Sequence, residues 1–341
     1  MELEARIATL RMAETFVISR GASDEAEVVF VELRHGGISG FGEATPIDRY
    51  DESAESALAF VQEAEEVLGD DPFALEAIEA RLASRPGERA AKAAIDAALH
   101  DLCGKLAGLP VWKLLGLRRA GPPTSWTIWL GDPDDMALRA ELVRGRFKRL
   151  KLKLGGDDGL DVERVRAVRG VSDVPLQVDV NEYWSLDDAL EALPELAELG
   201  VEYCEQPLPA GDPAAPELKR RSPLPIYVDE DCHILADVPA CAERAHGLTV
   251  KLAKSGGIRE AVRIAHAGRA LGLGLMLGCM NESGLAVSAG AQIASLFDHV
   301  DLDGNLLLAE DPWPGVRLVD GVQLPPDAPG LGVRHAHKTV A

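Results

Sequence analysis

Eight short apolar runs recur between residues 126 and 301, and each is followed by a helical stretch rich in Ala and Glu. The runs begin at Trp126, Leu150, Leu176, Val201, Ile226, Leu248, Leu273 and His299, about 22 to 27 residues apart. This spacing is the length of one strand–helix unit, so eight successive units predict a closed parallel barrel with helices outside. A doubly wound open sheet also alternates strands and helices, but it more often carries a glycine fingerprint for phosphate after an early strand. No such fingerprint is present, so we favour the barrel.

The first 120 residues have a different pattern and predict an α+β capping domain. Strand-like runs at 16–18, 28–33 and 38–43 precede a helical region from about 53 to 117. Residues 19–25 are polar, and we expect them to form a loop that folds over another part of the molecule. Gly121-Pro122-Pro123 marks a boundary, which places the barrel domain at 121–315. Residues 316–341 are rich in proline and glycine, and we expect them to return to the cap.

The charge and the cysteine content exclude several classes of protein. Of 341 residues, 56 are acidic and 35 are basic, which gives a formal net charge of −21. Such a surface repels nucleic acid and anionic membranes. The five cysteines form no C-x-x-C pair, which suits buried thiols in a reducing compartment. The N-terminus has no signal-peptide pattern, and no run reaches the roughly 18 apolar residues of a membrane span. We therefore expect a cytoplasmic protein that binds neither nucleic acid nor membrane.

Lys151 and Lys153 alternate with leucines in the stretch Leu150–Leu154. Side chains alternate between the two faces of a strand, so one face here is apolar and the other carries two ammonium groups. One interpretation is an edge strand whose lysines face water. The other is a strand whose lysines point into a charged site, where carboxylates balance them. The polar residues that follow the neighbouring apolar runs favour the second interpretation.

Polar or charged side chains follow six of the apolar runs at the same point, the carboxyl end of the predicted strand. They are Lys151, Lys153, Asp179, Asn181, Glu205, Asp229, Glu230, Lys251, Lys254, Asp301 and Asp303. Taken singly, each could cap a helix or lie in a solvated loop. In a parallel barrel, however, the carboxyl ends of all strands meet at one mouth, where active sites lie. Charges at this level on six strands therefore predict an active site.

The residue types indicate the chemistry of that site. Asp179, Glu205 and Asp229 come from consecutive strands and offer oxygen ligands without His or Cys. Such a set suits one Mg²⁺ ion and disfavours zinc. Lysines precede and follow this set on the second and sixth strands, so two amines could act on opposite faces of one carbon. A lysine that serves as a base near neutral pH needs a pKa lowered toward about 7 to 8, and neighbouring cations and the charge of the metal act in that direction.

Five motifs together resemble the muconate-lactonizing subgroup of the enolase superfamily. They are Lys151-x-Lys153, Asp179-Val180-Asn181, Glu205-Gln206-Pro207, Asp229-Glu230 and Lys251-Leu252-Ala253-Lys254-Ser255-Gly256-Gly257. The resemblance covers nearly the whole chain. It implies a (β/α)7β-type barrel of modified TIM form, with an N-terminal α+β capping domain that the C-terminal segment completes.

The same resemblance implies roles for the charged residues. Mg²⁺ would be bound by Asp179, Glu205 and Asp229, and the acid–base pair would be Lys153 and Lys251. Lys151 would steady the substrate carboxylate as it becomes an enolate. Lys254 would support these residues or tune the charge of Lys251.

The stretch Asp301-Leu302-Asp303-Gly304 narrows the reaction that the resemblance implies. Two carboxylates on one face of a strand end suit a substrate ammonium group, although a capped turn at Asp303-Gly304 would also explain the pattern. Asp-x-Asp at this place resembles the dipeptide epimerases, the group that includes L-Ala-D/L-Glu epimerase. The expected reaction is therefore inversion at the C-terminal α-carbon of an L,L-dipeptide. The alternative is an N-acylamino acid racemase or an o-succinylbenzoate synthase, which shares the first proton transfer but binds no free ammonium group.

The resemblance also suggests which residues surround the substrate. Four stand at or near strand ends where relatives contact substrate: Thr127, Cys279, Met280 and Glu282. Ser23 occupies the position where alanyl-glutamate epimerases carry an arginine for the glutamate side chain, and Arg20 lies three residues earlier. We therefore expect a neutral, apolar or basic second residue in the dipeptide. Four aromatic residues either line an apolar wall or pack in the core, namely Trp126, Trp129, Tyr183 and Trp184.

Two interpretations from other classes have less support. A barrel protein that binds a small molecule without catalysing a reaction would be expected to lack one of the lysines or metal ligands. None of these residues is missing. A zinc hydrolase would need histidine ligands, and no H-x-H or H-E-x-x-H motif lies near a predicted strand end. The sequence leaves open which dipeptide is bound and whether the protein forms homo-oligomers.

Overall fold

The computed structural model describes residues 1–334, and its largest unit is an eight-stranded parallel sheet. The strands are β4 (Trp126–Ile128), β5 (Leu150–Lys153), β6 (Leu176–Asp179), β7 (Val201–Glu205), β8 (Ile226–Val228), β9 (Gly247–Lys251), β10 (Gly274–Gly278) and β11 (His299–Asp301). They neighbour one another in chain order, and Thr124 next to β4 forms a parallel bridge with Val300 of β11. The sheet therefore closes on itself. Each strand lies where an apolar run predicted one, so the predicted barrel is confirmed.

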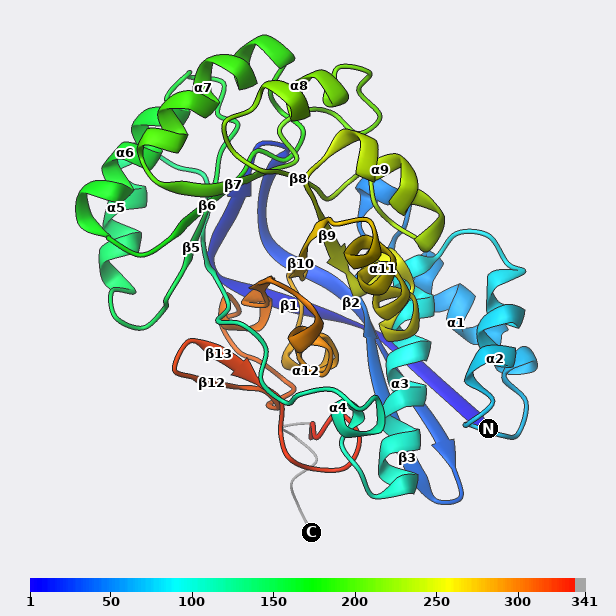
Figure 1. Cartoon of the computed structure of the whole chain (residues 1–341). Coiled ribbons are helices and arrows are strands. Elements are labelled where there is room, and N and C mark those ends of the chain that lie inside the picture. The colour runs from blue at the N-terminus through cyan, green and yellow to red at the C-terminus, as the bar shows by residue number, and fades with distance from the viewer. Residues whose placement is uncertain (335–341) are drawn as a thin grey trace.

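Helices follow the first seven barrel strands and lie outside the barrel (Figure 1). They are α5 (Pro133–Leu142), α6 (Asp161–Val171), α7 (Leu186–Glu198), α8 (Ala215–Arg221), α9 (Val238–Arg244), α11 (Ile258–Ala270) and α12 (Gly284–Ala291), with the short elements α10 (Leu252–Ser255), η2 (Leu235–Asp237) and η3 (Ala294–Leu296). β11 leads into the 3-10 turn η4 (Gly304–Leu306) instead of an eighth helix. This is the predicted (β/α)7β arrangement. Among the described residues, no helix combines the length and the apolar content that a membrane span requires.

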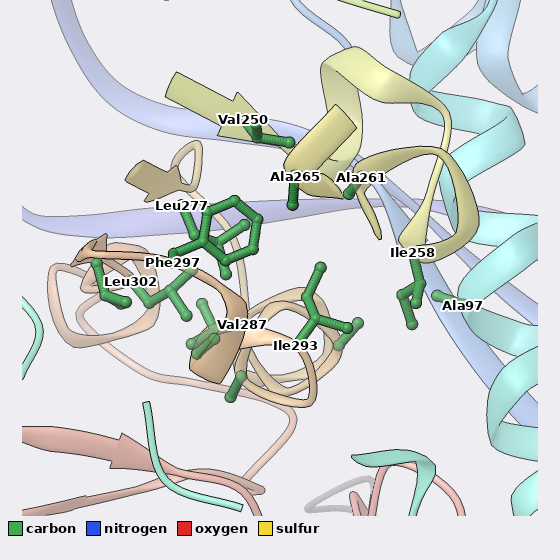
Figure 2. Packing of buried hydrophobic residues seen from close by; sticks show 14 of the residues in the cluster. Ala97, Val250, Ile258, Ala261, Ala265, Leu277, Val287, Ile293, Phe297 and Leu302 are labelled. Atoms are coloured by element: carbon green, nitrogen blue, oxygen red, sulfur yellow. The ribbon is translucent and has the colours of Figure 1, made fainter. Parts of the chain in front are cut away.

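Apolar cores lie between the barrel strands and the helices around them. Barrel strands are buried on both faces, and in β5, β6 and β9 their Val and Leu residues alternate with buried polar residues such as Lys151, Gln177 and Thr249. Val250 of β9 and Leu277 of β10 pack together with Ala261 and Ala265 of α11, and Phe297 lies in the same cluster (Figure 2). Each buried Val, Leu or Phe contributes about 1.5–3 kcal/mol. This packing fixes the strands and thereby the side chains at their carboxyl ends.

The cap begins with an antiparallel sheet of β1 (Glu2–Ile18), β2 (Gly21–His35) and β3 (Ile38–Ala44). The helices α1 (Ala54–Leu68), α2 (Leu75–Ala83), α3 (Arg89–Ala107) and α4 (Val111–Leu114) follow, with the 3-10 turn η1 (Asp48–Tyr50) between β3 and α1. The long β1–β2 hairpin, dark blue in Figure 1, runs from the cap helices across the barrel. The cap thus supplies a second wall over the barrel.

The prediction of a loop at residues 19–25 is wrong. Only Ser19 and Arg20 form the turn, and residues 21–25 already belong to β2, where Ser23 pairs with Phe16 of β1. The prediction failed because Ser, Asp and Glu have low strand propensity, whereas pairing with β1 decides the conformation here. β1 also begins at Glu2, far ahead of the predicted run at 16–18. The polar segment does fold over the barrel, but as the tip of a hairpin.

The C-terminal segment returns to the cap as expected, and residues 335–341 of that prediction lie outside the described residues. After the hairpin of β12 (Arg317–Val319) and β13 (Val322–Leu324), the chain reaches α3. The fully buried Asp101 of α3 accepts hydrogen bonds from the backbone N–H groups of Phe41 at 2.9 Å and Leu331 at 2.7 Å, and Lys105 Nζ lies 2.6 Å away. One carboxylate therefore joins β3, α3 and the C-terminal segment.

Gly330→Ala should destabilise the protein by about 2–4 kcal/mol. Gly330 has a φ of +73°, and a Cβ there would lie 2.1 Å from Asp101 Oδ1. The substitution therefore strains the backbone and displaces the Asp101 carboxylate. Gly36→Ala is the matched control, because its φ is +59° but a Cβ would meet nothing within 4 Å. Thermal unfolding followed by circular dichroism checks the difference, and equal Tm values for the two variants would contradict it.

Candidate active site

Charged residues of the barrel lie at one level because of the strand register. Lys153 pairs with Asp179, and Asp179 pairs with Glu205, across β5, β6 and β7. On the other side, the register through β10 places Lys251 of β9 level with Asp301 of β11. β5 and β9 are four strands apart in a closed sheet of eight. Lys153 and Lys251 therefore approach the barrel mouth from opposite sides.

The lysines of β5 point into the barrel. Lys151 is 1% exposed and Lys153 is 8% exposed, so the interpretation of this stretch as an edge strand with water-facing lysines is wrong. Lys151 Nζ lies 3.1 Å from Asp179 Oδ2, 2.8 Å from Glu205 Oε2 and 2.9 Å from Asp301 Oδ2. Lys153 Nζ donates to Asp179 Oδ2 at 2.6 Å. These carboxylates offset the large cost of burying ammonium groups.

Lys251 has a carboxylate partner of its own. Its Nζ donates to Asp229 Oδ2 at 2.7 Å. The neighbouring Gly278 leaves room for the lysine, since a Cβ there would lie only 3.0 Å from Lys251 Cε. The buried Lys254 contacts the other carboxylate oxygen of Asp229 and donates to the carbonyl oxygen of Cys232 at 3.0 Å. Lys254 therefore holds the Asp229 side chain in place.

The pairing shifts the pKa values of both partners. Burial alone would raise the pKa of Asp179 and of Asp229, but the adjacent lysines outweigh it and hold both below their usual range. Burial lowers the pKa of Lys251, but the Asp229 carboxylate outweighs it, so the pKa of Lys251 lies above its ordinary value. The Asp229 carboxylate thus acts against the lowered lysine pKa expected from the sequence, whereas the charge of the expected metal ion would act toward it.

The residues at this level fit a divalent cation by the chemistry of their donors. Asp179, Glu205 and Asp229 supply only oxygen, which Mg²⁺ prefers. Glu205 is fully buried, and its Oε1 has no hydrogen-bond partner among the described residues. Burial and the nearby Asp179 raise the pKa of Glu205 to about 7, although Lys151 and Lys251 act in the opposite direction, so the positive charge around this carboxyl group does not offset its burial. No group of three Asp, Glu, His or Cys side chains within residues 1–334 forms a ready-made ion site, and Lys151 bridges Asp179 and Glu205 instead.

A cavity of about 740 Å³ reaches these lysines. Residues predicted to touch the substrate line it together: Ser23, Thr127, Lys151, Lys153, Lys251, Cys279, Met280, Asp301 and Asp303. The three predicted metal ligands are fully buried and do not line it. Residues of β1, β2 and the segment 45–54 form the wall on the cap side. The volume is in the range that holds a small ligand.

The two aspartates that end the eighth barrel strand both face this cavity. Asp301 Oδ2 accepts a hydrogen bond from Lys151 Nζ at 2.9 Å, and Asp303 Oδ2 accepts one from the Thr127 N–H at 2.6 Å. Burial and the neighbouring Asp301 raise the pKa of Asp303 to about 7. Asp303 precedes η4, but its side chain makes no capping hydrogen bond there. The interpretation as a side-chain-capped turn is therefore wrong.

Gln206 supports the site, although sequence reasoning assigned it no role. Its side-chain Oε1 accepts hydrogen bonds from the backbone N–H groups of Asp229 at 2.8 Å and Glu230 at 3.0 Å. Its φ of +37° is unusual for a residue other than glycine. Gln206 thus ties the end of β7 to the end of β8. The Glu205-Gln206-Pro207 motif was visible in the sequence, but the contact across strands was not.

Two arginines join the cap to the barrel, Arg20 from the turn of the β1–β2 hairpin and Arg49 from η1. Arg20 Nη1 donates to Glu230 Oε1 at 2.9 Å, to Glu182 Oε2 at 3.2 Å and to the Asn181 carbonyl at 3.0 Å. Arg49 donates to both carboxylate oxygens of Glu182, at 2.8 and 2.7 Å. Arg20 therefore lines the cavity, and its Nη1 is held by three acceptors on the barrel. Charge-assisted pairs of this kind are the stronger hydrogen bonds of a protein.

The four aromatic residues considered for an apolar wall do not line the cavity. Trp126 stacks on Phe147, and Trp129 packs against Phe16. Trp184 is buried and its Nε1 donates to Asp161 at 2.8 Å, whereas Tyr183 is 45% exposed. The wall interpretation is therefore wrong. The apolar part of the lining includes Met280, which was predicted, and Phe16, Ile18, Ile47 and Leu307, to which the sequence assigned no role at the site.

Glu282, which follows β10, is buried beside a second carboxyl group from the cap. Glu43 of β3 accepts a hydrogen bond from the Ser283 N–H at 2.9 Å and one from the Ser283 hydroxyl. Burial and the nearby Glu43 raise the pKa of Glu282 to about 8. In the unfolded chain Glu282 returns to a pKa near 4.5. The stabilising effect of this shift is therefore complete below pH 4.5 and is lost as the pH rises through 8.

Glu282→Gln should flatten the pH dependence of stability. The free energy of unfolding of the parent should fall between about pH 5 and 8. In the variant this fall should be smaller by about 1–4 kcal/mol. Urea unfolding at several pH values measures both. Glu14→Gln, on the exposed face of β1, is the matched control. If Glu282→Gln and the control gave the same profile as the parent, the shift at Glu282 would be refuted.

Comparison with known proteins covers both parts of the chain. Residues 3–116 match the mandelate racemase / muconate lactonizing enzyme N-terminal domain, and residues 135–338 match the enolase C-terminal domain-like family. The L-Ala-D/L-Glu epimerase of Bacteroides thetaiotaomicron is 38% identical over 95% of this chain and 85% of its own length.

Solved structures agree in fold over nearly the full length. The dipeptide epimerase of Enterococcus faecalis, complexed with Mg and the dipeptide L-Leu-L-Tyr, has a TM-score of 0.94 at 30% identity and covers 98% of this chain and 99% of its own. The N-succinyl Arg/Lys racemase of Bacillus cereus has a TM-score of 0.93 at 31% identity, and the match covers 99% of this chain and 97% of the racemase chain. The two neighbours differ in their reactions, so the fold alone does not separate an epimerase from a racemase.

Proposed function

This chain belongs to the mandelate racemase/muconate lactonizing enzyme family of the enolase superfamily, and we propose that it is a dipeptide epimerase that uses one Mg²⁺ ion per active site. The reaction inverts the α-carbon of the C-terminal residue of an L,L-dipeptide. One observation carries the proposal: Lys153 and Lys251 reach a single cavity from opposite sides of the barrel, beside Asp301 and Asp303.

The two lysines act on opposite faces of the α-carbon. The neutral amine of one lysine takes the α-proton, and the electron pair of the C–H bond passes into a planar enolate of the substrate carboxylate. The ammonium group of the other lysine then returns a proton to the opposite face. A well-placed acid or base contributes about 10²–10⁴-fold to such a transfer. Both side chains are largely buried, at 8% and 7% exposure, which limits proton exchange with water during the step.

The substrate carboxylate is placed against positive charge on the barrel floor. Asp179, Glu205 and Asp229 would hold the Mg²⁺ ion. When bound, the ion supplies charge that stabilises the enolate dianion and offsets the carboxylates that hold protons on the lysines. Burial lowers the pKa of Lys151, but the carboxylates around it raise it well above its ordinary value. Lys151 therefore remains an ammonium group and stabilises developing negative charge without acting as a base.

Asp301 and Asp303 favour a free dipeptide over an acylated amino acid. Both are buried and line the cavity, and two adjacent buried carboxylates are costly unless cations pair with them. Lys151 pairs with Asp301, and the α-ammonium group of a dipeptide supplies a second cation. The substrates of an N-acylamino acid racemase or an o-succinylbenzoate synthase have no such group. The acidic pair is the observation that separates the two candidates.

A screen of L,L-dipeptides in D₂O with Mg²⁺, read by mass spectrometry, tests the proposal. A substrate should gain one deuterium at the C-terminal α-carbon, and removal of the metal with EDTA should stop the exchange until Mg²⁺ is restored. N-acetyl and N-succinyl amino acids belong in the same screen. If they exchanged and no dipeptide did, the racemase would replace the epimerase.

A further inference from the structure

Five basic side chains line the active-site cavity, and each is already paired with a carboxylate. Arg20 contacts Glu230 and Glu182, and Arg49 contacts Glu182. The three lysines contact the carboxylates at the strand ends. Among the described residues that line the cavity, every basic side chain therefore has a carboxylate partner in the protein, and beyond Lys151, which faces the substrate carboxylate, none is an unpaired cation that an acidic substrate side chain would meet.

Three acidic side chains on the cap wall form no ion pair with the rest of the described chain. Glu25 and Glu27 are two residues apart on β2 and so face the same side of the strand, and Asp48 lies in η1. Arg11 stands opposite Glu25 in the β1–β2 register, but the two form no ion pair. Asp24, on the other face of β2, does not line the cavity and accepts a hydrogen bond from Thr15 at 2.6 Å. The cap wall therefore presents three carboxylates to the cavity that no described cation contacts directly.

The same wall also offers apolar surface and a buried hydroxyl. Phe16, Ile18 and Ile47 line the cavity beside these acids. Thr45, which is 4% exposed, lines it too, and its hydroxyl has no hydrogen-bond partner among the described residues. Lysine and arginine combine an apolar stem with a cationic end. A wall of apolar side chains with carboxylates and an acceptor hydroxyl matches that combination.

In the proposed reaction, the other substituents of the reacting α-carbon have places at the barrel side of the cavity. The side chain of the C-terminal residue is then directed toward the cap wall. In the enolate of the proposed reaction, the two faces would point to Lys153 and Lys251 and the carboxylate to Lys151, and all three lysines line the cavity. The amide nitrogen leads to the α-ammonium group at Asp301 and Asp303. The side chain of the C-terminal residue takes the remaining direction, away from the barrel floor and toward the cap.

We propose that Glu25, Glu27 and Asp48 select dipeptides whose C-terminal residue is lysine or arginine. This substrate class rests on the proposed epimerase activity. The acids attract the cationic end and repel a glutamate or aspartate side chain, while the apolar residues beside them cover the stem. Exposed charge pairs are individually weak, so the selectivity is the sum of three such contacts and is sensitive to salt.

A panel of four dipeptides measures the selectivity: L-Ala-L-Lys, L-Ala-L-Leu, L-Ala-L-Glu and L-Lys-L-Ala. The kcat/KM for L-Ala-L-Lys should exceed that for L-Ala-L-Leu about tenfold, and that for L-Ala-L-Glu by more. The ratio should shrink in 0.5 M NaCl. L-Lys-L-Ala should gain no such advantage, because its lysine is not on the reacting carbon. Turnover that favoured L-Ala-L-Leu or L-Ala-L-Glu would overturn the substrate class and leave the epimerase intact, whereas exchange with no dipeptide would overturn the epimerase itself.

Charge variants connect the selectivity to the named residues. Glu25→Gln combined with Glu27→Gln should lower the Lys-to-Leu ratio of kcat/KM about three- to tenfold. Glu25→Lys combined with Glu27→Lys should reverse the order of L-Ala-L-Lys and L-Ala-L-Glu. Glu14→Gln, on the same hairpin but outside the cavity lining, should leave the ratio unchanged. A ratio that stayed the same in both double variants would show that these acids do not select the side chain.

Discussion

Replacement of Lys251 by methionine should abolish the interconversion of dipeptide epimers. Methionine keeps the length and the apolar stem of lysine but cannot carry a proton, so the loss should reach at least about 10²–10⁴-fold in kcat. Lys153→Met should have an effect of the same size, because inversion needs one group on each face. Chiral chromatography of the product measures how much interconversion of the epimers each variant retains.

The two variants should differ in the exchange that remains. Each keeps one lysine, and that lysine can still remove and return a proton on its own face. Lys251→Met and Lys153→Met should therefore retain solvent deuterium exchange with opposite epimers. Lys113→Met, on an exposed position of α4, is the control for the loss of a lysine as such. Interconversion within tenfold of the parent in either catalytic variant would refute the two-lysine arrangement.

Asp303→Asn should weaken the use of free dipeptides about 10²–10³-fold in kcat/KM. Asp303 is 3% exposed, and losing one member of a buried charge pair costs about 2–5 kcal/mol. The same dipeptide with an acetylated N-terminus carries no ammonium group, so its slow turnover should be the same in parent and variant. Parallel kinetics with the two substrates measure the difference. An equal loss with both substrates would point to a structural defect instead of ammonium binding.

The pH dependence of KM provides a second measure of the same contact. Burial and the nearby Asp301 raise the pKa of Asp303 to about 7. The carboxylate is therefore charged above this pH and neutral below it, so the KM for a dipeptide should rise as the pH falls through about 7. Asp303→Asn should remove this dependence. Circular dichroism at each pH establishes that both proteins stay folded.

The barrel could be predicted from the sequence because its signal is local and repeated. The buried barrel strands are rich in Val, Leu and Ile, and the spacing between each such run and the helix that follows it fixes the length of the unit. The lysine pair of β5 followed from the same logic, since two charges next to a buried strand need partners. Their burial beside Asp179, Glu205 and Asp301 is what that expectation requires.

The cap wall could not be predicted in the same way. Its hairpin is polar at the tip, so composition argued for a loop, and only pairing with β1 makes it a strand. The contact between Arg20 and Glu230 joins residues 210 positions apart and depends on where the hairpin crosses the barrel. The positive φ of Gln206 could not be predicted from any local sequence pattern. Features that depend on two distant elements meeting need the fold before they can be recognised.

The hydrogen bond between Asp101 and Leu331 has a consequence for how the protein is made. The two residues are 230 positions apart, and a ribosome adding about 5–20 residues per second needs on the order of 10–50 s to synthesise the intervening chain. During that time the cap helices have emerged with Phe41 and Lys105, but the Leu331 N–H that donates to Asp101 Oδ1 has not. The first domain to be translated is thus among the last to be finished, and a nascent chain that stalls late would expose an incomplete cap to the quality-control machinery of the cell.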